Sequence, residues 1–73
     1  MLINIEDRLP EVFQDVLALC ISLEKTYAFD LGEKYFSIDR LVKWNDEWPI
    51  CFRNERFYKS KVTHWMLLPE MPL

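Results

Sequence analysis

Residues 15–22 carry the most continuous hydrophobic stretch of the chain, with apolar side chains at both alternating sets of positions. A short apolar run bounded by polar residues is typical of a central strand that is covered on both sides. An amphipathic helix over residues 10–24 is the alternative, because periodicity alone does not separate a short buried strand from a buried helix. The β-branched side chains of Val16 and Ile21 favour the strand.

Residues 25–31 alternate between polar and apolar side chains, with Tyr27, Phe29 and Leu31 on one face. This alternation is the pattern of a half-buried strand. Gly32 follows, and it is the only glycine of the chain. We expect a tight turn there, because glycine adopts a positive φ without steric cost.

Residues 35–44 alternate again and predict a further strand. Its apolar face consists of Phe36, Ile38, Val42 and Trp44, and Arg40 is the exception. A short helix from Ser37 is the alternative, because Ile38, Leu41 and Val42 also match helical spacing.

A hairpin is predicted next, with a turn at residues 45–46 and a return strand over residues 47–53. Pro49 has no N–H to give to a ladder, so this strand should lie at a sheet edge or carry a bulge. Trp44 and Trp48 flank the turn and are expected to pack across the hairpin.

The final strand is predicted over residues 61–68, where Trp65 and Leu67 would face the core. His64 and Met66 would then lie on the opposite face. An exposed connection over residues 54–60 precedes this strand. Pro69 and Pro72 follow it, and they prevent the strand from continuing.

These elements predict one small domain over residues 1–73, mainly β, with a small α+β fold as a variant. Four or five strands would form an antiparallel sheet or a small open barrel, and the N-terminus would be irregular or hold one helical turn. The chain has 73 residues, of which 51% are apolar and 15% aromatic. Aromatic side chains bury large areas, which helps so short a chain to form a core.

The charge is distributed unevenly along the chain. The net charge is −3, yet residues 53–64 alone carry +3. This segment also contains aromatic side chains, and the combination suggests a binding surface. The candidate binding residues are Arg53, Arg56, Tyr58, Lys59, Lys61 and His64.

No signal peptide or membrane helix is expected, because the apolar runs are far shorter than the ~20 residues that a membrane span needs. We therefore expect a cytoplasmic protein, without membrane contact and with reduced thiols. Cys20 and Cys51 are expected to act as small hydrophobic residues. Neither a metal nor another cofactor is expected, because the single His and the two Cys show no metal-site spacing.

Both ends of the chain resemble a known family. The segments Ile5-Glu6-Asp7-Arg8-Leu9-Pro10-Glu11, Asp15-Val16-Leu17 and Val62-Thr63-His64-Trp65-Met66-Leu67-Leu68-Pro69-Glu70-Met71-Pro72 look like the domain of unknown function 551 family. Leu67 stands where the family ending has its first proline, and Met71 stands at its penultimate one. The N-terminal tryptophan of the family is replaced by Ile3 or Ile5. The resemblance implies a small accessory protein of phages and prophages, which would act in the cytoplasm of a bacterial host cell, and it implies no catalytic residues.

The resulting expectation is a non-enzymatic module that binds a host or phage protein. Edge strands make a homodimer a further expectation. The alternative is a nucleic-acid-binding module that uses residues 53–61, because positive charge interleaved with aromatic side chains suits single strands. A small enzyme or ligand-binding protein built around His64 is a third reading, since catalysis would require a partner within hydrogen-bonding reach.

Overall fold

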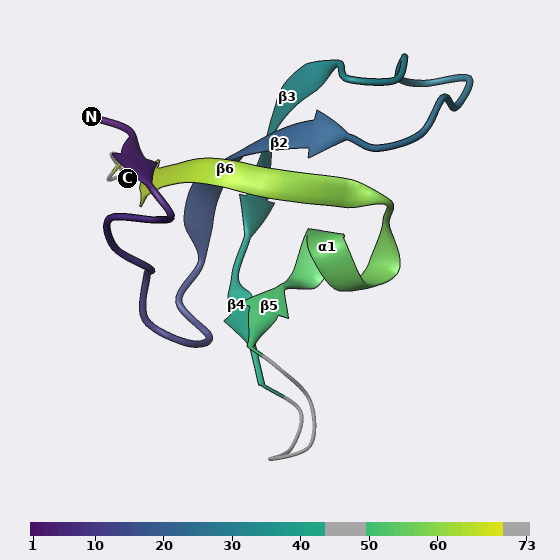
Figure 1. Ribbon diagram of the computed structural model, residues 1–73. Coiled ribbons are helices and arrows are strands. Elements are labelled where there is room, and N and C mark those ends of the chain that lie inside the picture. Colours follow the sequence, from purple (N-terminus) through teal and green to yellow (C-terminus); the bar gives the residue numbers. More distant parts are fainter. Residues whose placement is uncertain (44–49, 70–73) are drawn as a thin grey trace, which may run out of the picture.

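A computed structural model describes residues 1–43 and 50–69 (Figure 1). Its elements are, in chain order, β1 (Ile3–Asn4), β2 (Val16–Ser22), β3 (Lys34–Asp39), β4 (Leu41–Val42), β5 (Cys51–Phe52), α1 (Arg53–Phe57) and β6 (Ser60–Leu67). A four-stranded antiparallel sheet has the order β1-β6-β2-β3, and β4 and β5 form a two-stranded sheet. The predicted mainly β fold with an antiparallel sheet is confirmed, and within the described residues the sheet does not close into a barrel.

The central strand β2 is confirmed as a strand, and its alternating burial shows which face of the sheet is covered. Val16, Ala18 and Cys20 are fully buried on the inner face. Leu17, Leu19 and Ile21 are only partly buried on the outer face. The prediction that both faces of this strand are covered is therefore wrong for the outer face, which the described residues cover only in part. Apolar content predicts which side chains could be buried, but only the fold decides which face receives a cover.

The final strand is confirmed as β6, and a bulge corrects its predicted pattern. Leu19 pairs with His64 and Cys20 pairs with Val62, so Thr63 is an extra residue. Because the bulge shifts the alternation, Val62 and Trp65 both face the core. The prediction that Leu67 enters the core is wrong. Leu67 is the last residue of β6 and pairs with the core residue Val16, but its side chain is 57% exposed because it borders a surface depression beside the N-terminal segment.

The predicted strand over residues 25–31 does not form. The Thr26 hydroxyl accepts hydrogen bonds from the backbone N–H groups of Ala28 (3.1 Å) and Phe29 (3.0 Å). Such local bonds hold a chain in turns and compete with strand pairing. Tyr27 is fully exposed as a result. The turn predicted at Gly32 is confirmed, with φ at +80°.

The strand predicted over residues 35–44 forms in two parts, β3 and β4, interrupted at Arg40. Its predicted apolar face is reversed in β3. Phe36 and Ile38 are 55% and 54% exposed, whereas Asp39 is fully buried. The helix from Ser37 is excluded. The predicted core side chain of Val42 is buried.

The return strand is observed as β5, which pairs antiparallel with β4. The predictions for Trp44, Trp48, Pro49 and the turn at residues 45–46 lie outside the described residues, as does the role of Pro72. The connection predicted over residues 54–60 is exposed at residues 56–59, and it contains most of α1, which the sequence did not predict. The N-terminal segment is irregular apart from β1, which pairs with β6.

One core joins the two sheets. It includes Val16 and Cys20 from β2, Leu41 from β4, Phe52 from β5 and Trp65 from β6. Figure 1 shows how this arises: the line of β3 continues into β4, β5 lies beside β4, and α1 follows β5 below β6. Cys20 and Cys51 are both free thiols.

Candidate functional site: an aromatic groove beside β3

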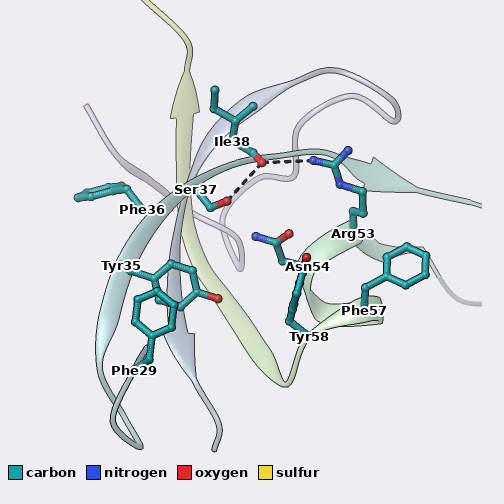
Figure 2. A pocket seen from close by; sticks show the side chains of 9 residues that line it. All are labelled: Phe29, Tyr35, Phe36, Ser37, Ile38, Arg53, Asn54, Phe57 and Tyr58. Atoms are coloured by element: carbon teal, nitrogen blue, oxygen red, sulfur yellow. Dashed lines mark hydrogen bonds between the residues drawn. The ribbon is translucent and has the colours of Figure 1, made fainter. Parts of the chain in front are cut away.

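A groove of about 530 Å³ runs between β3 and α1 (Figure 2). Four aromatic side chains line it on two walls. Figure 2 shows Phe29 and Tyr35 on the β3 side, and Phe57 and Tyr58 at the end of α1. The rings of Phe29 and Tyr35 are stacked, with centroids 4.4 Å apart. The remaining lining residues are Phe36, Ser37, Ile38, Arg53 and Asn54. The groove is therefore mainly aromatic, with a polar floor and an arginine at one end.

The helix α1 forms the far wall because the chain leaves β5 at Arg53. The Arg53 N–H still donates to the Arg40 carbonyl (3.0 Å), which is the last backbone bond of the β4–β5 pair. Glu55 then fixes the helix in place. Its carboxylate accepts from the Phe52 N–H (3.2 Å) and from the Val62 N–H (3.0 Å). A single side chain thus ties the start of α1 to the neighbouring strand β6.

A buried polar cluster around Asp39 lies behind Asn54, which lines the groove. The Asp39 carboxylate accepts from the backbone N–H groups of Arg40 (2.8 Å) and Asn54 (3.2 Å), and the Arg53 Nε lies 3.9 Å from it. Burial raises the pKa of the Asp39 carboxyl, and these hydrogen bonds and the arginine only partly oppose the rise. Burial also raises the pKa of the Cys20 thiol, and the neighbouring Asn54 side chain partly opposes the rise. These groups satisfy each other, which indicates a structural role.

The structure separates the six predicted binding residues onto three surfaces. Arg53 and Tyr58 line the groove. Arg56 and Lys59 line a neighbouring depression with Glu24 and Glu55, and Lys59 Nζ lies 3.7 Å from Glu24 Oε2.

The other two predicted residues, Lys61 and His64, lie on the outer face of the sheet, opposite Ile21 and Leu19 of β2. His64 Nδ1 lies 3.0 Å from the Thr63 hydroxyl. The basic segment is therefore not one continuous patch in three dimensions. Acidic side chains also interrupt it at the depression.

Sequence reasoning missed the β3 side of the groove. Phe29 and Tyr35 were expected on strands, but no local signal connected them with α1. Phe29 and Phe57 are far apart in the chain and meet across the groove only because the chain turns into α1 after β5. Within the described residues there is no cluster of three or more side chains that could hold a metal ion.

The fold and the groove define a small mainly β protein in which an aromatic cleft lies beside an edge strand. The chain belongs to the family described as Protein of unknown function (DUF551), whose model matches residues 3–73. No curated protein and no solved structure shows a significant match to the chain. Among the described residues, no helix has the length and apolar character needed to span a membrane.

Proposed function

We propose that this protein is a small non-enzymatic accessory protein of the phage or prophage type, and that it acts by binding another protein through the groove between β3 and α1. The groove itself carries the proposal. Three of its aromatic side chains are accessible, since Phe36, Phe57 and Tyr58 are 55%, 63% and 66% exposed. Aromatic and arginine side chains are favoured anchors at protein interfaces. The phage context rests on the resemblance of both chain ends to the family.

The chemistry of the groove supports binding over catalysis. Tyr35 and Ser37 are the residues of β3 that bring hydroxyl groups to the groove, and the Tyr35 hydroxyl is hydrogen-bonded to that of Ser60. Asp39 and Asn54 beneath them hold the start of α1. No described lining residue pairs a nucleophile with a base. His64, the side chain on which an enzyme was considered, lies on the outer face instead.

A nucleic-acid interface is the weaker alternative. A single strand would require positive charge along a continuous track with stacking rings beside it. Here Lys61 lies on the outer face, Lys59 is close to Glu24, and Arg53 is close to Asp39. We expect binding to single-stranded DNA to be absent at low salt. A measurable affinity that falls steeply as salt is added would favour the alternative instead.

Co-purification from bacterial cells that carry the phage or prophage tests the proposal. The wild-type protein is expected to retain a partner that the Phe57→Ala variant retains weakly. The matched control is Phe13→Ala, because Phe13 is 57% exposed but lies outside the groove. Recovery of no partner, or equal loss in both variants, would contradict the proposal.

A further inference from the structure

Among the described residues, no strand lies beside the outer edge of β3. In the part of the chain that the structure describes, β3 is the last strand of the four-stranded sheet and pairs only with β2. An unpaired edge presents backbone N–H and C=O groups that another strand can bind. The edge borders the groove, because Phe36, Ser37 and Ile38 line it.

The register identifies which backbone groups face outward. The Ser22 N–H donates to the Glu33 carbonyl (2.9 Å), whereas the Leu23 N–H donates to the Lys59 carbonyl on the other side of β2. In an antiparallel pair the bonded residues recur at every second position. Counting from Glu33, the backbone groups of Ser37 and of the residues two positions on either side of it therefore bond to β2. The N–H and C=O groups of Lys34, Phe36 and Ile38 then point away from β2.

Further along the chain, the same edge is paired with a strand. β4 continues the line of β3, and β5 pairs with β4 as far as the bond from the Arg53 N–H to the Arg40 carbonyl. There the chain turns into α1 and leaves the edge. The Arg53 guanidinium reaches back and donates to the Ile38 carbonyl (3.4 Å), as Figure 2 shows. The groove thus occupies the place where a longer β5 would have continued beside β3.

We infer that an extended segment of a partner protein adds to β3 as a further strand and lies between β3 and α1. This inference rests on the proposed function and specifies how the groove binds. Main-chain hydrogen bonds to Phe36 and to the residues two positions away would supply affinity, and alternate side chains would supply specificity. One set of side chains enters the aromatic groove between Tyr35 and Tyr58. The other set lies beside Phe36 on the outer face.

The charges around the groove indicate the composition of that segment. Arg53 is 43% exposed at its side chain, and a guanidinium has five N–H donors. One of them donates to the Ile38 carbonyl, and the 3.9 Å contact with Asp39 is an ion pair that is too long for a hydrogen bond. A carboxylate opposite Ile38 can be bound as well, and Lys34 is exposed at the other end of the strand. The fitting ligand is therefore an extended, alternating segment with apolar or aromatic side chains and an acidic residue near Arg53.

A proline substitution tests the backbone interaction directly. Phe36→Pro removes an N–H that points away from β2, so the domain should stay folded. Ser37→Pro removes an N–H that bonds to β2 and should lower the melting temperature strongly. The probe is a random peptide library that is selected for binding to the wild-type protein. We expect the selection to enrich extended sequences that contain acidic and aromatic residues. Affinity of a selected peptide should fall roughly tenfold or more in Phe36→Pro, because a main-chain hydrogen bond is lost and the ring obstructs the incoming strand.

A second measurement does not depend on any variant. In the wild-type protein, the Phe36 amide should exchange its hydrogen more slowly when the peptide is bound. If Phe57→Ala weakens binding but Phe36→Pro does not, and the Phe36 amide is not protected, strand addition is overturned while the groove proposal stands. If the library yields no binder, strand addition is overturned, and the co-purification decides the groove proposal separately. If the pure protein forms a dimer that Phe36→Pro abolishes, the occupant is a second copy and the inference of a partner segment is overturned.

Discussion

At the scale of single residues, the prediction that Trp65 faces the core is confirmed, and the structure adds the contacts that hold its ring. Its side chain is 3% exposed, and its indole N–H donates to the Arg8 carbonyl (2.8 Å). The Arg8 guanidinium lies 5.6 Å from the ring centroid. The ring therefore connects β6 to the N-terminal segment.

Replacing this ring should be costly. Trp65→Ala is expected to lower the free energy of unfolding by about 3–5 kcal/mol, because a large cavity forms in the core. Ile38→Ala is the control, since Ile38 is 54% exposed on the outer face, and it should cost less than about 1 kcal/mol. Chemical denaturation followed by circular dichroism measures both. Similar losses in the two variants would show that Trp65 is not a core residue.

Asp39 should give the protein a characteristic pH dependence. Its pKa in the folded state is raised above the ordinary value of 3.8, mainly by burial. The folded protein then holds this proton more tightly than the unfolded chain does. The stabilising contribution is present below pH 3.8 and is lost as the pH rises through the raised pKa.

Asp39→Asn removes this titration. We expect the wild type to lose stability relative to the variant as the pH rises. The unfolding free energies of both proteins, measured from about pH 3 to about pH 7, test this expectation. A difference that does not change with pH, or that shifts towards the wild type, would contradict the assignment. Asp15→Asn is a useful control, because Asp15 forms an exposed ion pair with Arg40 (2.8 Å).

At the scale of elements, the helix α1 is short and depends on contacts with its neighbours. Glu55 satisfies two backbone donors, one at the start of α1 and one in β6. We expect Glu55→Ala to lower the unfolding free energy by about 1–3 kcal/mol, since two partly buried N–H groups lose their acceptor. Glu24→Ala should cost only about 0–1 kcal/mol, because its ion pair with Lys59 lies at the surface. Thermal unfolding of the two variants compares them.

The elements also show where sequence patterns reach their limit. Alternation correctly identified β2 and β6, because their side chains are strongly apolar and their neighbours are polar. It failed for residues 25–31, where the hydroxyl of Thr26 stabilises turns instead. In β3 it found the strand but assigned the core to the wrong face. The buried Asp39 is tolerated there only because Arg40 and Asn54 donate hydrogen bonds to it.

At the scale of the whole molecule, the fold depends on a strand from the end of the chain. β6 lies inside the sheet, between β1 and β2, and it supplies Val62 and Trp65 to the common core. A chain cut after Lys61 should be unfolded, because β1 and β2 lose the strand that pairs with both of them and the core loses Val62 and Trp65. A chain that ends at Pro69 keeps all of β6 and serves as the control. Nuclear magnetic resonance spectra of the two chains decide the matter, and a dispersed spectrum from the shorter chain would refute the prediction.

The sequence by itself determined the mainly β class, the strands β2 and β6, the turn at Gly32 and the family to which the chain belongs. The strands and the turn are local features, because each is encoded by neighbouring side chains that favour one backbone conformation. The family is identified from short sequence motifs, which are local as well. The tertiary structure alone decided which sheet face is covered, where α1 begins and that Phe29 meets Phe57 across a groove. Those features depend on contacts between distant segments and on the point where the chain leaves β5. A pattern along the chain contains no information about such contacts.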